Sequence, residues 1–180
     1  DDLPDGGAEQ FADTIKAIRK IKYNIVIEIL THDFKGIQSS VKKVLDANPN
    51  VFAHNIETVP RLYELARAQA NYQTSLKVLK TVKKLKPDIY TKSGLMLGLG
   101  ETKKEVLQVM HNLREIGCDI LTLGQYLQPS TFNLKVIEYI NPEVFDEYKK
   151  IGVSYGFKKV ISGPFVRSSY NLAKLNLQNK

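Results

Sequence analysis

The stretch TKSGLMLGLGE, residues 91–101, opens as a buried strand and runs into a cluster of glycines directly before a predicted helix. The glycines are Gly94, Gly98 and Gly100. Glycine lacks a β-carbon, so this cluster would let a ligand or a neighbouring backbone approach closely. Residues 102–105, TKKE, have the spacing of a capping box, and the free amides of a helix N-terminus bind anions. The pattern indicates a small-molecule site between a strand and a helix, with a tight turn that binds nothing as the alternative.

Strand-like segments recur along the chain, starting near residues 24, 51, 88, 119 and 158, and helical periodicity fills the intervals between them. Strands that alternate with helices in this way form right-handed βαβ units and a parallel sheet. The rhythm therefore predicts the α/β class. It fits both a barrel and an open doubly wound sheet.

The composition is that of an ordinary globular domain, with 180 residues, of which 43% are apolar and 25% charged. This length suits one domain or a large piece of a longer protein, and a start at Asp1 without an initiator Met favours the second. No apolar run reaches the roughly 18 residues that a membrane span requires. The net charge of +7 would suit an acidic partner, but the lysines interleave with apolar helix positions and no nucleic-acid signature accompanies them. We therefore expect neither a membrane nor a nucleic-acid partner.

Polar side chains gather where the predicted strands end, which is where parallel α/β enzymes place their chemistry. They are His32, Asp33, His54, Asn55, Glu57, Lys92, Ser93, Glu101, Gln125, Tyr126 and Gln128. This clustering favours an enzyme over a scaffold. No P-loop, nucleophile elbow, metalloprotease motif or CxxC pair is present, so the residues by themselves indicate only an α/β enzyme with a polar or anionic ligand.

Each of these residues also has a plain structural interpretation. His54 on a strand fits a hydrogen-bonded core histidine, and the loop at 32–33 fits a helix cap. The spacing of Glu57 and Arg61 fits a salt bridge at a helix start. Lys92 is harder to dismiss, because a lysine at the exit of a buried strand requires an anion or a carboxylate.

Several longer strings resemble the lipoyl synthases, in that family's order and over nearly the whole chain. They are DDLPDGGAEQFADTIKAIR from Asp1, VFAHNIETVPRLY from Val51, ANYQTSLKVLK from Ala70, TKSGLMLGLGET from Thr91, DILTLGQYLQPS from Asp119 and SGPFVRSSY from Ser162. The strings GQYLQP and GPFVRSSY are the most specific. The resemblance implies a partial (β/α) TIM-like barrel of the radical S-adenosylmethionine (SAM) type, truncated at its N-terminal side, over residues 1–163. Residues 164–180 would then form a C-terminal tail.

The resemblance also implies a sulfurtransferase that inserts two sulfur atoms, at C6 and C8 of a protein-bound octanoyl group. In this family one [4Fe–4S] cluster reduces S-adenosylmethionine to a 5′-deoxyadenosyl radical, and a second, auxiliary cluster is consumed as the sulfur source. Both clusters depend on cysteine triads that the family carries before the DDLPDGG segment. The single cysteine here, Cys118, is not at a ligand position and is expected to be a small buried residue leading into a strand. We therefore predict that this chain alone holds neither cluster stably and has no radical activity.

The ligand contacts follow from the family pattern, carried over position by position. The strand along the adenosine contributes Gly94, Met96, Gly98 and Glu101, and the ribose and methionine contacts are assigned to Asn55, Glu57, Lys92 and Ser93. The turn at 5–7 would lie near the methionine amino group.

The RSSY motif at the end of the chain resembles the place where a serine oxygen ligates the fourth iron of the auxiliary cluster. This assigns Ser168 as a catalytic metal ligand, with Ser169 as the alternative, and Arg167 as a positive charge beside the cluster. An alkoxide is a harder donor than a thiolate, so such a ligand could leave when the cluster is dismantled. A capped turn in the tail is the alternative interpretation.

The partners implied by the resemblance are octanoylated lipoyl carrier domains, namely the lipoyl-bearing subunits of 2-oxoacid dehydrogenases and the glycine cleavage H protein. An electron donor such as ferredoxin or flavodoxin is also implied. Two other functions stay open: a non-catalytic domain that binds a lipoyl carrier through its basic surface, and an α/β-barrel lyase or aldolase that uses Lys92. The lysine- and asparagine-bearing tail favours a mitochondrial or plastid copy, including the apicoplast, over a bacterial cytoplasmic one.

Overall fold

Five parallel strands form one sheet in a computed structural model that describes residues 3–169. The strands are β1 (Glu28–Leu30), β2 (Val51–Ala53), β3 (Tyr90–Leu97), β4 (Ile120–Gln125) and β5 (Lys159–Ser162). Their order across the sheet is β1-β2-β3-β4-β5, the same as their order in the chain. An open doubly wound sheet reverses its strand order at a switch point, whereas a barrel adds each strand beside the last. The sequential order therefore selects the partial barrel.

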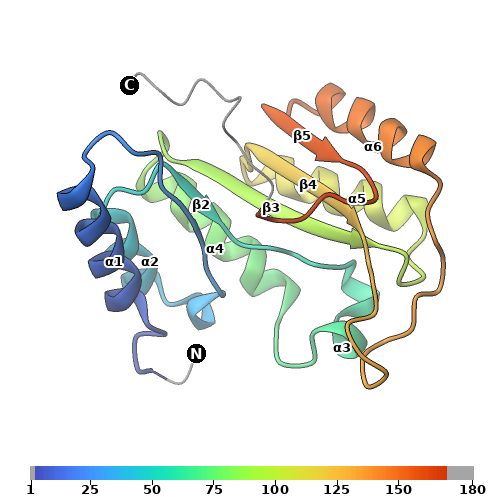
Figure 1. The fold of residues 1–180 in the computed structure, drawn as a ribbon, viewed down its shortest axis with the longest axis horizontal. Helices are drawn as coiled ribbons and strands as arrows, with labels where there is room; N and C mark the ends of the chain where they lie inside the picture. The colour runs from blue at the N-terminus through green and yellow to red at the C-terminus, as the bar shows by residue number, and fades with distance from the viewer. Residues whose placement is uncertain (1–2, 170–180) are drawn as a thin grey trace.

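Helices connect the strands and cover one face of the sheet. They are α1 (Ala8–Ile21), α2 (Gln38–Asp46), α3 (Tyr63–Ala66), α4 (Tyr72–Leu85), α5 (Lys103–Glu115) and α6 (Pro142–Ser154), with short 3₁₀ turns η1 (Phe34–Gly36) and η2 (Pro60–Leu62). Figure 1 shows α1 and α2 side by side at the β1 end, α6 at the β5 end, and α4 and α5 behind the sheet.

The helix starts follow their local sequences. Thr102 and Glu105 form the predicted capping box, in which each side chain accepts a hydrogen bond from the other residue's backbone amide. Asn141 caps α6 ahead of Pro142, as expected for an N1 proline. These caps satisfy amides that a helix cannot pair internally.

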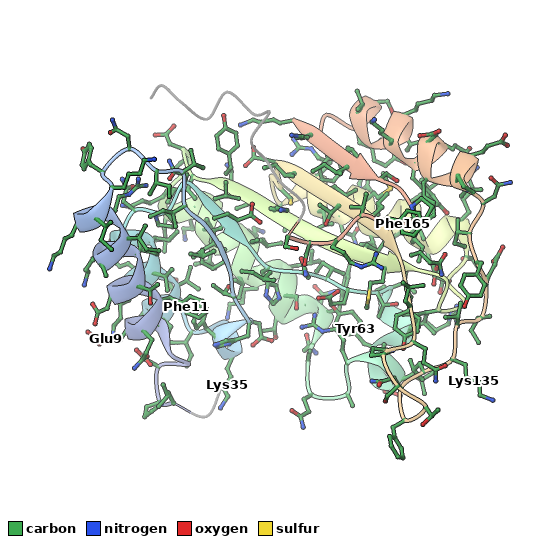
Figure 2. All side chains as sticks on the ribbon, viewed as in Figure 1. Glu9, Phe11, Lys35, Tyr63, Lys135 and Phe165 are labelled. Carbon is green, nitrogen blue, oxygen red and sulfur yellow. The ribbon has the colours of Figure 1, made fainter. Side chains whose placement is uncertain are left out.

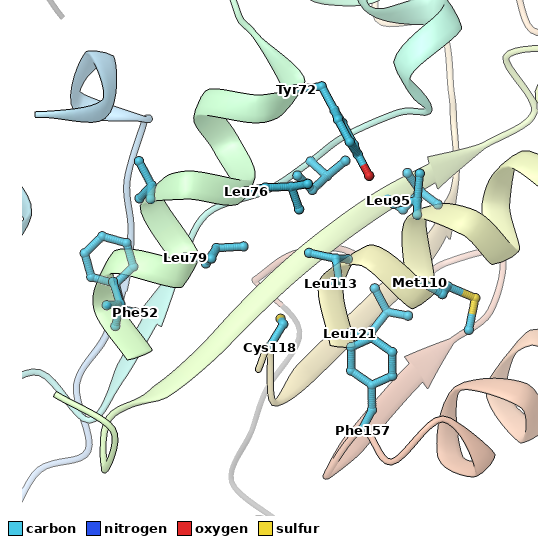
Figure 3. Close-up of a cluster of buried hydrophobic side chains, with 14 of the residues drawn as sticks. Phe52, Tyr72, Leu76, Leu79, Leu95, Met110, Leu113, Cys118, Leu121 and Phe157 are labelled. Carbon is cyan, nitrogen blue, oxygen red and sulfur yellow. The ribbon is translucent and has the colours of Figure 1, made fainter. Parts of the chain in front are cut away.

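The main hydrophobic core lies between the sheet and its helices. Phe52, Leu95 and Leu121 point from three neighbouring strands toward Leu79 and Leu113 on α4 and α5 (Figure 3). Alternate strand residues point to opposite faces of a sheet. The next residues along, such as Val51 and Ile120, accordingly form a small separate cluster on the other face.

The N-terminal strands are shorter than the apolar runs that predict them. The run at 24–30 contributes only three residues to β1, because side chains bind the backbone of the others. The Arg19 guanidinium donates to the Ile25 carbonyl, and Asn50 Oδ1 accepts from the Ile27 amide. Strand β2 likewise ends at Ala53, and the chain rejoins the sheet only through a bridge between Glu57 and Leu95. The interruption at residues 54–56 positions the functional site described next.

Candidate active site

A cavity of about 160 Å³ opens at the carboxyl ends of β2, β3 and β4. Its polar lining residues are Asn55, Glu57, Thr122, Gln125, Arg167 and Ser168. Gly94 and Met96 on β3 also line it. Polar groups from segments far apart in the chain thus converge at one mouth of the partial barrel, which is the functional end of (β/α) barrels.

Asn55 and Glu57 form a hydrogen-bonded pair in this cavity. The Asn55 side-chain amide donates to Glu57 Oε1 at 3.0 Å, while Asn55 Oδ1 is buried and has no hydrogen-bond partner among the described residues. Burial raises the pKa of the Glu57 carboxyl, and the Asn55 amide and the charge of Arg67 act against that rise. An orphaned buried acceptor is costly unless a ligand or water supplies a donor.

Gly94 leaves room for such a ligand. A β-carbon at this position would lie 2.8 Å from Asn55 Oδ1 and 2.9 Å from Thr122 Oγ1, closer than side chains tolerate. The Thr122 hydroxyl donates to the Ser93 carbonyl at 3.4 Å, so its oxygen can accept from a ligand. The floor of the cavity therefore consists of acceptors and suits a ligand with adjacent hydroxyl or amino donors.

The segment after β5 folds back over the same opening. The backbone amide of Gln125 donates to the Pro164 carbonyl at 3.3 Å. A β-carbon at Gly124 would collide with the Val166 carbonyl. Ser168 lines the cavity, whereas Ser169 is exposed and does not. Figure 2 labels Phe165 on this crossing segment. Tyr170 and the rest of the tail lie outside the described residues.

Arg167 lines the cavity but is exposed, and its guanidinium donates to the carbonyls of Pro164 (3.3 Å) and Val166 (2.7 Å). Neither of these two acceptors is a carboxylate. This places a cation beside Ser168 at the rim.

Lys92 and Ser93 do not line the cavity. Lys92 is the third residue of β3, so its placement at a strand exit was wrong. Its amine is completely buried and lies 2.6 Å from Glu28 Oε1, which supplies the carboxylate that such a lysine requires. The Ser93 hydroxyl accepts from the Ile56 amide at 3.2 Å. Because Lys92 does not line the cavity, the lyase interpretation, which relied on this amine, loses its support.

Glu101 and Gly98 shape the turn after β3 and do not line the cavity. The Glu101 carboxylate accepts from the amides of Gly98 (2.6 Å) and Leu99 (2.9 Å). Gly98, with a φ of 104°, faces the Glu138 carbonyl so closely that no β-carbon fits. The close approach predicted for this glycine is therefore to a neighbouring backbone.

The histidines at the strand ends are structural. His54 is buried between the Thr31 carbonyl and the Ser75 hydroxyl, each 2.9 Å from a ring nitrogen, and burial lowers its pKa. His32 contacts the Gly6 carbonyl at 2.6 Å, which ties the glycine turn near the N-terminus to the end of β1.

The remaining charged residues also have local partners. Asp33 accepts from the Lys35 amide and caps η1. The expected pairing of Glu57 with Arg61 is wrong, because Arg61 binds Glu105 at 2.7 Å. Asp5 accepts from the Gly7 amide and does not line the cavity.

Sequence reasoning missed Thr122, Gly124, Leu127 and Val166 as lining residues. Thr122 lies two residues before Gly124 on β4, so both side-chain positions face the same side of the sheet. In the pairing of β3 with β4, Thr122 lies opposite Gly94. Reading that register requires the strand pairing, which the sequence alone did not supply.

Residues 3–169 contain no group of three or more His, Cys, Asp or Glu side chains arranged to hold a metal ion. Cys118 is completely buried, and burial raises the pKa of its thiol to about 12. A thiol of this kind does not fit the thiolate ligand that an iron–sulfur cluster needs. Within the same residues, no helix is long and apolar enough to cross a bilayer.

The chain is similar in sequence to a known family and to several named proteins. The family model described as the radical SAM superfamily matches residues 4–113. The lipoyl synthase of Caldicellulosiruptor saccharolyticus is 55% identical over 170 residues, which cover 94% of this chain and 60% of that protein. The apicoplast lipoyl synthase of Plasmodium vivax is 50% identical over 180 residues, covering 99% of this chain and 41% of that protein. The chain therefore spans roughly 40 to 60% of the length of these relatives.

A domain of pyruvate-formate lyase-activating enzyme from Bacteroides vulgatus has the same fold, with a TM-score of 0.66 at 16% identity over 87% of this chain and 91% of that one. The sequential parallel sheet, this fold likeness and the family match agree with one another. The resemblance to lipoyl synthases is confirmed, and the chain belongs to the radical SAM superfamily.

Proposed function

We propose that this chain supplies the nucleoside-binding part of a lipoyl synthase, the enzyme that inserts two sulfur atoms at C6 and C8 of a protein-bound octanoyl group. The observation that carries the proposal is the acceptor-lined cavity in which Asn55, Glu57 and Thr122 meet Ser168. The similarity to lipoyl synthases supports the same assignment.

The cavity fits the ribose of S-adenosylmethionine. Two adjacent hydroxyl donors would satisfy the orphaned Asn55 Oδ1 and the half-buried Glu57 carboxylate, and Gly94 leaves the space for them. When bound beside a reduced iron–sulfur cluster, S-adenosylmethionine supplies an organic radical that abstracts hydrogen from an unactivated carbon. The role of Asn55 and Glu57 is to bind and orient the nucleoside by hydrogen bonds.

Ser168 and Arg167 are proposed to act at the rim. The Ser168 hydroxyl would ligate an auxiliary cluster, and the exposed Arg167 guanidinium would balance its negative charge. Their location at the same cavity as Asn55 supports a role near the reacting carbon. The chain's own Cys118 cannot hold a cluster, for the reasons given above.

Replacement of Ser168 tests the proposal. Ser168→Ala in the whole protein should leave S-adenosylmethionine cleavage largely intact and abolish lipoyl product. Ser169→Ala is the matched control and should retain product formation. A normal lipoyl yield from Ser168→Ala would rule out its catalytic role.

The chain alone is proposed to lack radical activity, because it has one cysteine and that cysteine is buried. Reconstitution of this chain with iron and sulfide should therefore give no stoichiometric cluster absorbance. Appearance of such absorbance would contradict this part of the proposal.

The proposed partners are octanoylated lipoyl carrier domains and an electron donor such as ferredoxin or flavodoxin. The net charge of +7 supports electrostatic steering of acidic partners. Binding of an octanoylated carrier domain should weaken as salt is raised.

The relatives include bacterial and apicoplast proteins, and a mitochondrial or plastid location for this chain is proposed from its tail composition. Fluorescence microscopy of the tagged whole protein checks it.

A further inference from the structure

The backbone that carries Asn55 and Glu57 is held from two sides. Between β2 and η2 the chain leaves the strand ladder, and it rejoins β3 at Glu57, whose amide donates to the Gly94 carbonyl at 2.9 Å. The Glu57 carbonyl in turn accepts from the Met96 amide at 2.8 Å. These two bonds fix the side of the segment that faces β3.

Arg67, which directly follows α3, holds the other side. Its Nη1 atom donates to the Asn55 carbonyl at 3.0 Å and reaches the Ile56 carbonyl at 3.4 Å. The Tyr63 hydroxyl donates to the same Ile56 carbonyl at 2.7 Å, and the Arg67 guanidinium lies 5.6 Å from the centroid of the Tyr63 ring. Tyr63 therefore contacts the Arg67 guanidinium with its ring and donates to one of the two carbonyls that Arg67 also binds. Figure 2 labels Tyr63 at this place in the fold.

The conformation held in this way is strained. Glu57 has a φ of 67°, in the left-handed region that a non-glycine residue adopts only where its surroundings impose it. Without the bonds to the Asn55 and Ile56 carbonyls, the segment could relax, and the Asn55 Oδ1 and Glu57 oxygens would no longer face the cavity together.

Arg67 acts on the cavity without entering it. The cavity is lined by Asn55 and Glu57, whereas Arg67 lines a separate surface depression of about 370 Å³ together with His32 and Asp33. A contact between Arg67 and a ligand in the first cavity is thus not required for its effect.

We propose that Arg67, supported by Tyr63, is a positioning residue that holds the segment 55–57 so that the Asn55 and Glu57 side chains select a nucleoside bearing both ribose hydroxyls. Nη1 carries two hydrogens, enough to reach both carbonyls, and the planar guanidinium fixes the directions in which they point. The positive charge of Arg67 also favours the ionised, accepting form of Glu57. The inference rests on the proposed function, since it assumes that the cavity binds a nucleoside.

Discrimination between two nucleosides tests the inference. Binding of 5′-methylthioadenosine and of its 2′-deoxy analogue to the whole protein is measured by calorimetry. The wild-type protein should prefer the hydroxylated ligand by about tenfold or more, as a hydrogen bond to a charged group would give. In Arg67→Met the preference should fall to about twofold or less, mainly through weaker binding of the hydroxylated ligand.

Two variants complete the series and one serves as the control. Arg67→Lys should restore part of the preference, and Tyr63→Phe, which keeps the ring but removes the hydroxyl, should lose part of it. Arg61→Met is the control, since Arg61 is exposed and pairs with Glu105. Its preference should equal that of the wild type.

The outcomes separate the two claims. A preference that survives both Arg67→Met and Tyr63→Phe would overturn the positioning role alone. An equal loss of affinity for both ligands would do the same, because it indicates a general structural defect. A wild-type protein that binds neither ligand would overturn the nucleoside site itself, and one that binds both equally would overturn the inference alone.

Discussion

Glu57 combines a left-handed backbone conformation with a half-buried carboxylate that lines the cavity. Its neighbour Asn55 occupies one of its oxygens, so a ligand can reach the pair only as a hydrogen-bond donor. Replacement by glutamine keeps the shape and removes the charge. Glu57→Gln should weaken 5′-methylthioadenosine binding by about tenfold or more, because bonds to charged acceptors are the stronger ones.

The pH dependence of binding follows from the same carboxylate. Burial raises the pKa of Glu57 above its ordinary 4.5, so the accepting form is lost at a higher pH than for an exposed glutamate. Wild-type affinity should therefore decline as the pH falls through this raised pKa, and Glu57→Gln should flatten the decline. Calorimetric titration at several pH values measures both. An equally steep decline in the variant would show that another group titrates.

The cavity floor depends on the absence of a side chain at Gly94. Gly94→Ala should displace the Asn55 and Thr122 side chains, because the new methyl group would lie within 3.0 Å of both oxygens. We expect nucleoside binding to be lost while the far-ultraviolet circular dichroism spectrum is unchanged. Gly163→Ala is the control, since its nearest neighbour would be an ordinary 3.6 Å away.

At the scale of single elements, the start of α5 depends on its capping box. Thr102→Ala should lower the free energy of unfolding by about 1 kcal/mol, the usual cost of losing an N-cap. Thr14→Ala is the control, because Thr14 lies inside α1, where alanine is the better helix former. Urea unfolding followed by circular dichroism measures both variants, and equal midpoints would contradict the assignment.

Glu105 adds a pH signature to this cap. Hydrogen bonds from Arg61 and Thr102 lower the pKa of the Glu105 carboxyl from 4.5 to about 2. A depressed carboxyl pKa contributes stability above the unfolded value, and the contribution is lost as the pH falls from about 4.5 toward 2. Because 26% of the Glu105 side chain is exposed, solvent and salt screen part of the effect.

At the scale of the whole molecule, the two ends of the sheet serve different purposes. The end opposite the cavity is tied by Asp119, whose carboxylate lies 2.9 Å from the amines of both Lys83 and Lys158 and accepts from the Thr91 amide at 3.0 Å. Burial acts to raise the pKa of Asp119, but these bonds outweigh it and lower the pKa. The contribution of Asp119 to stability is therefore present above its ordinary pKa and disappears as the pH falls through the lowered one.

Removal of this carboxylate should destabilise the fold without touching the cavity. Asp119→Ala is expected to lower the free energy of unfolding by about 3 kcal/mol, as the loss of a buried ion-pair partner does. Glu147→Ala, which breaks an exposed pair with Lys103, should cost about 1 kcal/mol or less. Both are measured by urea unfolding at neutral pH, and nucleoside affinity of the folded variants should stay at the wild-type level. A loss of affinity in Asp119→Ala would contradict the division between the two ends.

The sequence by itself determined the α/β class, the approximate positions of the five strands and helix starts such as those at Thr102 and Asn141. These features depend on local periodicity and on caps such as Thr102 and Asn141, which act within a few residues. It also placed Asn55, Glu57, Gly94 and the serine-containing tail at the site, through their resemblance to a known family.

Only the tertiary structure decided which strand ends face one another. The sequence suggests that Lys92 contacts a ligand, yet its amine is completely buried against Glu28, which lies on a different strand. Thr122 reads as an ordinary strand residue, yet pairing in register with Gly94 brings it to the cavity floor. The strand order that separates a barrel from an open sheet is likewise a property of pairing between distant segments. Such pairing depends on the packing of the whole chain, and no single stretch of sequence contains it.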